Sequence, residues 1–215
     1  NQSPRAYLAG LFLLVASMLL DLIDGWFAAR YHPQAKLAHL ADRIMDKAVY
    51  SMIFPLVSVG MMWRYQNLPE GTNQHLELLH VILVLILCVT VLMRDNFAHF
   101  MRNFSLRRGE DEEFKEITRL RTIIAAPIGV LLYIYAFYLP EAAESKFFSW
   151  VSWFAELNPR NLITIEILFL IINMGSIAGY CRKYGTACLD DLCLGDQLLR
   201  RRILSIFPNA LTVMN

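Results

Sequence analysis

The strongest constraint in this sequence is a carboxylate at the end of an apolar segment. Residues 6–20 are almost wholly apolar, and Asp21 follows them directly. A charged side chain at the centre of a membrane helix costs about 2.5–3.5 kcal/mol, and residues of this kind usually serve a function. Asp24 follows three residues later, and Asp42 and Asp46 form a second pair, four residues apart, beside another apolar segment.

The spacing of these aspartates predicts a shared metal site. Residues three or four apart lie on one face of a helix, so each pair shares a face. Two such helices facing each other would gather four carboxylates, which cannot stay together at neutral pH without cations. Oxygen ligands suit hard divalent ions such as Mg²⁺ or Mn²⁺. The alternative is that the pairs are two acidic helix ends at a solvated membrane surface.

Small residues share the faces of the aspartates. Gly25 and Ala28 lie four and seven residues after Asp21, and Ala38 lies four residues before Asp42. Carboxylates next to such small side chains leave room for a ligand to approach the helix backbone.

Composition and hydropathy predict an all-α, polytopic membrane helix bundle. The chain has 215 residues, of which 56% are hydrophobic, and its net charge of +1 gives no reason to expect a nucleic-acid partner. Crossing hydrocarbon as a helix takes about 20 apolar residues. Five full spans are therefore expected, at Ala6–Ala29, Ile44–Trp63, Leu79–Met101, Thr122–Leu139 and Ile163–Tyr180.

The basic residues predict the orientation of the bundle. If the aspartates lie on the cytoplasmic side, 16 of the 20 Lys and Arg residues fall on that side as well. This bias agrees with the positive-inside rule, so the active site is expected at the cytoplasmic end.

Four arginines flank the third connection of the predicted bundle. An arginine in apolar surroundings needs a partner, and its planar fork suits a phosphate. Snorkelling to the membrane surface is the alternative role for arginines at such positions. We expect anion binding by Arg94, Arg102, Arg119 and Arg121.

The aspartate motif resembles that of the CDP-alcohol phosphotransferase (CDP-alcohol phosphatidyltransferase) family. The family pattern is Asp-x2-Asp-Gly-x2-Ala-Arg-x8-Gly-x3-Asp-x3-Asp, and residues 21–46 match it without a gap at both aspartate pairs, the first glycine and the first alanine. Two positions depart from it. Ala29 stands where the family has arginine, which affects the expected nucleotide or phosphate contact, and Ala38 replaces the second glycine.

Looser motifs resemble phosphatidylglycerophosphate synthases and phosphatidyltransferase-type cardiolipin synthases. These motifs are Asp46-Lys47, Arg94-Asp95 followed by Arg102, and Arg119-x-Arg121-Thr122. The resemblance implies transfer of a phosphatidyl group from CDP-diacylglycerol to a phosphorylated alcohol, with glycerol 3-phosphate as the expected acceptor and CMP as the product. The alternatives are a cardiolipin, inositol-phosphate or serine acceptor specificity, a non-catalytic or transport-type membrane protein that binds metal or nucleotide, and a structural scaffold.

The resemblance also implies roles for individual residues. Asp21, Asp24 and Asp42 are the expected first metal ligands. Asp46 is expected to bind the second of two Mg²⁺ or Mn²⁺ ions and to act as the general base on the acceptor hydroxyl. The expected contacts of the nucleotide are Asp21, Gly25, Ala28, Ala38, Asp42, Asn209 and Thr212. The implied location is a bacterial or organellar inner membrane, and long apolar faces permit a homodimer.

The end of the sequence resembles the beginning of a family member. Family members open with an amphipathic segment followed by Pro-Asn-x-x-Thr, and Pro208, Asn209 and Thr212 match that pattern. We therefore expect residues 1–185 to form the transmembrane bundle and 186–215 to be a polar linker with an amphipathic segment in permuted order. The complete bundle would then have six spans. The alternative is a plain C-terminal amphipathic tail.

Overall fold

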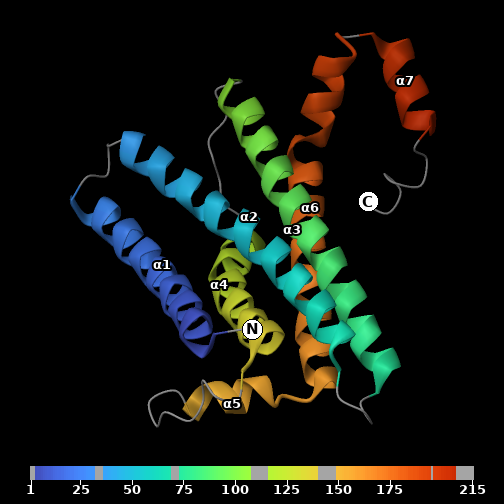
Figure 1. Cartoon of the computed structure of the whole chain (residues 1–215). Coiled ribbons are helices and arrows are strands. Elements are labelled where there is room, and N and C mark those ends of the chain that lie inside the picture. Colours follow the sequence, from blue (N-terminus) through green and yellow to red (C-terminus); the bar gives the residue numbers. More distant parts are fainter. Residues whose placement is uncertain are drawn as a thin grey trace.

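In the computed structural model, the described residues form helices and no strands (Figure 1). The structure describes residues 3–31, 36–68, 73–107, 116–139, 149–194 and 196–206; of residues 21–22, 24–31, 36–48, 102, 105–107, 116–120, 122 and 204–206 it describes the backbone alone. The helices are α1 (Pro4–Tyr31), α2 (Lys36–Gln66), α3 (Gln74–Arg107), α4 (Glu116–Phe137), α5 (Ser149–Ala155), α6 (Pro159–Leu192) and α7 (Gln197–Ile206).

The five longest helices cover four of the five predicted spans, and α4 covers Thr122–Leu139 except for its last two residues. In the described part of the chain, Gln74–Met101 in α3 and Pro159–Leu192 in α6 are long and apolar enough to cross a membrane, and Pro4–Leu20 and Ile123–Phe137 are shorter apolar helices. α6 continues beyond the predicted end at Tyr180 to Leu192. The fold class is therefore confirmed as all-α, while the number of spans stays a prediction.

Two apolar cores hold the bundle together. The larger core lies between α2, α3, α4 and α6 and includes Phe54, Leu87, Leu132 and Phe169. The smaller core joins α1, α4 and α5 through side chains such as Leu11, Ile134 and Val151. Figure 1 shows α5 lying across the lower ends of the bundle and α7 beside the upper end of α6. Because α4 belongs to both cores, it links α1 and α5 to the rest of the bundle.

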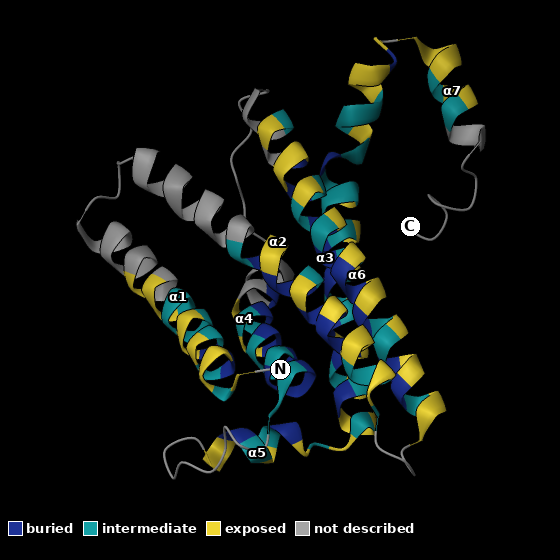
Figure 2. Cartoon of the chain, viewed as in Figure 1, coloured by how far each residue is buried: buried dark blue, intermediate teal, exposed yellow. Residues whose placement is uncertain are grey.

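The outward faces of α3 and α6 are also apolar. Leu85, Val89 and Met93 of α3, and Ile171 and Met174 of α6, are all exposed, and Figure 2 shows exposed residues along both helices. A contiguous apolar surface of this kind is unusual on a soluble monomer and fits contact with lipid. Together with the two long apolar helices, it indicates membrane association.

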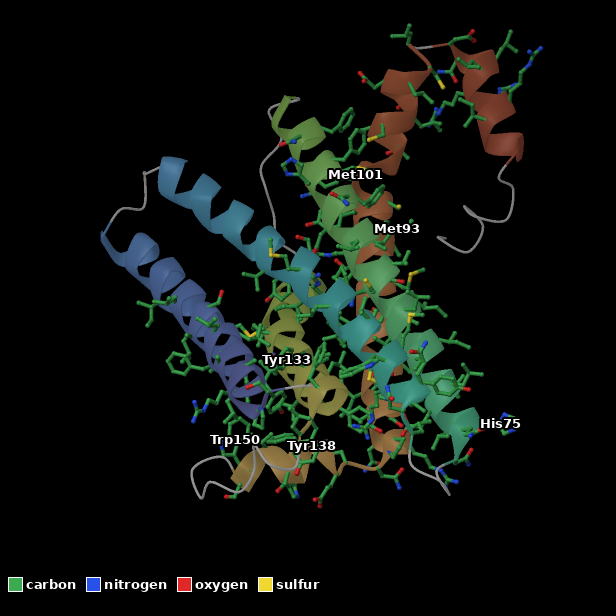
Figure 3. All side chains as sticks on the ribbon, in the orientation of Figure 1. His75, Met93, Met101, Tyr133, Tyr138 and Trp150 are labelled. Atoms are coloured by element: carbon green, nitrogen blue, oxygen red, sulfur yellow. The ribbon has the colours of Figure 1, made fainter. Side chains whose placement is uncertain are left out.

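Two glycines let α4 approach its neighbours closely. A Cβ at Gly10 of α1 would lie 2.2 Å from the hydroxyl of Tyr133, and a Cβ at Gly60 of α2 would lie 2.5 Å from the ring of Phe137. Tyr133 donates a hydrogen bond to the carbonyl of Tyr7 at 3.4 Å (Figure 3). A side chain at Gly10 would therefore displace the Tyr133 ring, and one at Gly60 would displace the Phe137 ring.

A cluster of polar side chains lies in the lower half of the bundle. This Glu166 cluster consists of Arg64, Glu77, His80, Tyr135 and Glu166, which come from α2, α3, α4 and α6. His80 Nε2 is hydrogen-bonded to Glu166 Oε1, with both side chains fully buried. The Tyr135 hydroxyl donates to Glu77 at 2.9 Å, while Arg64 donates to the Tyr135 carbonyl at 2.9 Å and lies over its ring. The cluster thus ties four helices together.

We predict that Glu166→Ala destabilises the protein strongly. Removing one partner of a buried hydrogen bond leaves the other unsatisfied and costs about 1–3 kcal/mol, which corresponds to a fall of roughly 2–12 °C in the thermal midpoint. Tryptophan fluorescence of the detergent-solubilised protein during heating measures that midpoint. The control is Asp191→Ala, since Asp191 is exposed. Equal midpoints for the two variants would contradict the stabilising role of the Glu166 cluster.

Candidate functional site

Two of the four predicted anion-binding arginines meet at one aspartate. Arg94 of α3 and Arg121 of α4 are both buried, with 4% and 3% of their surface exposed. Arg94 Nη1 donates to Asp95 Oδ1 at 2.9 Å, and Arg121 Nη2 donates to Asp95 Oδ2 at 3.0 Å. The carboxylate of Asp95 therefore holds the two guanidinium groups next to each other.

Helix α6 completes this arginine site, which we define as Arg94, Asp95, Arg121, Asn173 and Ser176. Arg94 Nε donates to Ser176 Oγ at 3.1 Å, and Arg121 Nε donates to Asn173 Oδ1 at 3.2 Å. Asn173 and Ser176 are buried and three residues apart, so they lie on the same face of α6. Residues from three helices thus fix both guanidinium groups.

The arginine site carries an excess of positive charge. It contains two guanidinium groups and one carboxylate, which leaves a net charge of +1 in a buried position. Arg94 Nη2 is buried and has no hydrogen-bond partner among the described residues. An unpaired buried donor is costly, and more so when it is charged. The arrangement therefore suits an anion that brings its own acceptor oxygen.

Tyr50 connects the arginine site with the aspartate motif. The Arg121 guanidinium lies over the Tyr50 ring, 5.4 Å from its centroid. Tyr50 follows Asp46 by four residues within α2, which is about one helical turn. The arginine site therefore lies about one turn of α2 away from the last aspartate of the motif.

The four aspartates lie on α1 and α2, which pack against each other. Asp24 lies seven residues before the end of α1 at Tyr31, and Asp42 lies six residues after the start of α2 at Lys36. At 1.5 Å per residue, both positions are about 10 Å from the connection between the helices. The backbone thus places both pairs at a similar distance from this end of the bundle. The side chains of the four aspartates lie outside the described set.

The remaining predicted site residues also lie outside that set. Arg102 and Arg119 belong to α3 and α4, and the structure describes only their backbone. The same holds for Gly25, Ala28 and Ala38, while Asn209 and Thr212 follow the last described residue. Among the side chains that are described, no group of three His, Cys, Asp or Glu residues could hold a metal ion. That finding does not include the four aspartates.

An apolar groove of about 590 Å³ begins beside the arginine site. It is lined by Val15, Met18 and Leu19 of α1, Tyr50 of α2, residues of α4 between Ile123 and Ile134, and Trp150 and Phe154 of α5. Tyr50 therefore belongs both to the groove and to the surroundings of Arg121. Figure 3 shows Trp150 on α5, at the opposite end of the bundle from Met101.

Sequence reasoning missed the polar residues of α6 and the partner of His80. Asn173 and Ser176 interrupt an apolar helix at a spacing of three, with Tyr180 four residues later, and that polar stripe was the available signal. Glu166 was a similar signal, because it is a lone carboxylate in an apolar segment. His80 is not close to Glu166 in sequence, so only the packing of α3 on α6 revealed the pair.

The family model for CDP-alcohol phosphatidyltransferase matches residues 2–157 of this chain. No curated protein matches the chain, and no solved structure does. The match covers both aspartate pairs, Arg94 and Arg121, and ends just before α6. The chain therefore belongs to the CDP-alcohol phosphatidyltransferase family. Membership supports a transferase that acts on a CDP-linked donor and an alcohol acceptor in phospholipid biosynthesis.

Proposed function

We propose that this protein transfers the phosphatidyl group of CDP-diacylglycerol to the hydroxyl of glycerol 3-phosphate and releases CMP. The observation that carries this proposal is the buried arginine site with its net charge of +1, about one helical turn from the aspartate motif. A binding site for an uncharged alcohol would have no need for two buried guanidinium groups. A phosphate on the acceptor supplies the oxygens that these groups lack.

The proposed reaction exchanges one phosphorus–oxygen bond for another. The acceptor hydroxyl oxygen attacks the phosphorus that carries the diacylglycerol group. A bond forms between that oxygen and phosphorus, while the bond to the CMP oxygen breaks. Asp46 takes the proton of the hydroxyl as general base, and CMP leaves with the electron pair of the broken bond. The arginine site holds the acceptor phosphate so that the hydroxyl reaches the donor.

The aspartates fit divalent ions by the chemistry of their donor set. Four carboxylates on two packed helices offer hard oxygen ligands, which suit Mg²⁺ or Mn²⁺. We propose that Asp21, Asp24 and Asp42 hold the first ion and that Asp46 contributes to a second. Bound there, such ions would neutralise the pyrophosphate and the charge that develops on the leaving group.

The nucleotide of the donor is proposed to lie along α1 and α2. Gly25, Ala28 and Ala38 have side chains small enough to let it approach the helix backbone, and Asn209 and Thr212 would join it from the end of the chain. Arg102 and Arg119 would add to the phosphate subsite. Ala29 stands where the family has arginine, which supports a non-catalytic metal- or nucleotide-binding protein as the second candidate function.

One acyl chain of the donor is proposed to lie in the apolar groove. From Ile123 to Ile134, α4 extends for eleven residues, or about 16 Å, which is close to half of a hydrocarbon core about 30 Å thick. The groove starts at Tyr50, beside the proposed phosphate subsite, and reaches Trp150 at α5. A lipid with its head group at the arginine site could therefore place one chain along α4.

This arrangement agrees with an active site at the cytoplasmic end of a bundle with five spans. The end of α1, the start of α2 and the end of α3 lie at the same end of the bundle as α7 (Figure 1). That end carries most of the Lys and Arg residues, which the positive-inside rule assigns to the cytoplasm. Location in a bacterial or organellar inner membrane and assembly as a homodimer belong to the same proposal.

We predict that Asp46→Asn lowers CMP release by about 10²–10⁴-fold, because a general base contributes that much to the rate. The assay uses detergent-solubilised protein with CDP-diacylglycerol, acceptor and Mg²⁺ or Mn²⁺. Asp191→Asn is the control, since Asp191 is exposed in the last turn of α6. Near-normal turnover of the Asp46 variant would reject its role as base.

We predict that glycerol 3-phosphate is used at least about 100-fold more efficiently than glycerol, serine or inositol. Each of these three alcohols lacks a phosphate to pair with the buried charged donor, and polar sites reject such analogues strongly. The measurement is kcat/KM for CMP release with each alcohol. Similar values for glycerol 3-phosphate and for the acceptors without a phosphate would contradict the phosphate subsite.

We predict that Ala126→Phe raises the KM for dioleoyl CDP-diacylglycerol at least about tenfold. The larger side chain would fill the groove and remove contacts worth roughly two buried methylene groups. The dihexanoyl donor should be affected less, because its chains are too short to reach along α4. Val89→Phe, on the exposed face of α3, is the control. An equal effect on both donors would argue against an acyl chain in the groove.

A further inference from the structure

Helix α6 contributes to the arginine site from outside the part of the chain that matches the family model. The match ends at residue 157, and α6 begins at Pro159. Asn173 and Ser176 each accept a hydrogen bond from the Nε of one arginine. Their contribution to the site therefore comes from a part of the chain that the family match does not cover.

The hydrogen bonds of Arg94 leave one edge of its guanidinium group for a ligand. Nε donates its single hydrogen to Ser176, and Nη1 donates one of its two hydrogens to Asp95. Nη2 is buried and has no partner among the described residues. Burying a charged donor without a partner is unfavourable. An oxygen of an anion is therefore the expected partner of Nη2.

Ser176 differs from another buried serine within a helix of this bundle. Ser58 donates its hydroxyl hydrogen to the carbonyl of Phe54 at 2.9 Å, the usual bond to the residue four positions earlier. For Ser176, the described structure gives the bond that it accepts from Arg94 and no acceptor for its own hydrogen. Its hydroxyl oxygen lies 3.1 Å from Arg94 Nε. Nε and Nη2 share one edge of the guanidinium group.

Asn173 differs from Ser176, because both the nitrogen and the oxygen of its amide have hydrogen-bond partners. Its Nδ2 donates to the carbonyl of Phe169 at 2.8 Å, which leaves Oδ1 to accept from Arg121 at 3.2 Å. The amide orientation is thus determined by the helix itself. Asn173 holds Arg121 in place, and we regard it as a positioning residue.

We propose that the Ser176 hydroxyl and Arg94 Nη2 together bind one phosphate oxygen of the acceptor, which makes Ser176 a substrate-binding residue. This inference rests on the proposed function for the nature of the acceptor. The chemistry that it requires is an oxyanion that accepts one charged and one neutral hydrogen bond at the same oxygen. A phosphate monoester meets that requirement, whereas an uncharged polyol does not.

Steady-state kinetics of Ser176→Ala and Ser176→Thr test the proposal. Loss of one hydrogen bond to a charged group should raise the KM for glycerol 3-phosphate by about tenfold in Ser176→Ala. The KM for CDP-diacylglycerol and kcat should change less than about twofold, and Ser176→Thr should restore much of the acceptor affinity because it keeps the hydroxyl. Ser58→Ala is the matched control, as it removes a buried serine hydroxyl outside the site.

Two results of that experiment would overturn the proposal. The first is an acceptor KM in Ser176→Ala equal to that of the wild type. The second is a parallel rise in the KM of both substrates together with a larger fall in thermal midpoint than in Ser58→Ala, which would show a merely structural role.

A binding measurement separates this proposal from the proposed function. Inorganic phosphate should raise the thermal midpoint of the wild-type protein and of Ser58→Ala, and should raise that of Ser176→Ala much less. If the wild type releases no CMP with any alcohol but shows this pattern, the proposed reaction fails and the phosphate contact of Ser176 stands. If phosphate stabilises Ser176→Ala as much as the wild type, the contact is wrong whatever the activity.

Discussion

The contact between Asp95 and two buried arginines is the interaction on which the upper half of this bundle depends. Guanidinium groups buried among apolar helices are costly unless they are paired. Here Asp95 pairs with Arg94 and Arg121, at 2.9 and 3.0 Å, and α6 supplies further acceptors for both. The pairing joins α3 to α4 directly. It also fixes the position of α6 along the bundle axis, because Asn173 and Ser176 must face the two Nε groups.

A comparable principle operates in the lower half of the bundle. Apolar side chains pack well over a range of helix positions, whereas a buried hydrogen bond requires a narrow range of distances and angles. The bond between His80 and Glu166 fixes α3 against α6, and the bond between Tyr135 and Glu77 fixes α4 against α3. With polar contacts in both halves, these helices have little freedom to slide. That rigidity suits a protein that must hold two substrates in line.

The proposed chemistry follows from two polar groups in the upper half of the bundle, the aspartate motif and the arginine site, which carry opposite charges. The carboxylates on α1 and α2 are the proposed site for cations, and the arginine site is the proposed site for an anion. Tyr50 lies between them, one helical turn from Asp46 and in contact with Arg121. A donor bound through metal ions and an acceptor bound through its phosphate would therefore meet near Tyr50. The apolar groove begins at the same residue, so a lipid chain has a path from that point along α4.

Much of the fold could be predicted because its signals are local. Long apolar segments determine helices, and the five that we predicted coincide with α1, α2, α3, α4 and α6. The aspartate motif and the arginines near the third connection were recognisable for a similar reason, since motif spacing is a property of neighbouring residues. The family match over residues 2–157 confirms what that motif indicated.

Only the tertiary structure decided which residues complete the site. Asp95 was visible as part of a motif, but its role in joining Arg94 to Arg121 depends on how α3 and α4 both pack against α2 and α6. Asn173 lies 52 residues from Arg121 and Ser176 lies 82 residues from Arg94, and no local pattern links such distant positions. The sequence by itself determined the helices, the spacing of the carboxylate pairs and the arginines near the third connection. The packing of the helices determined the partners, because hydrogen bonds depend on distances in space.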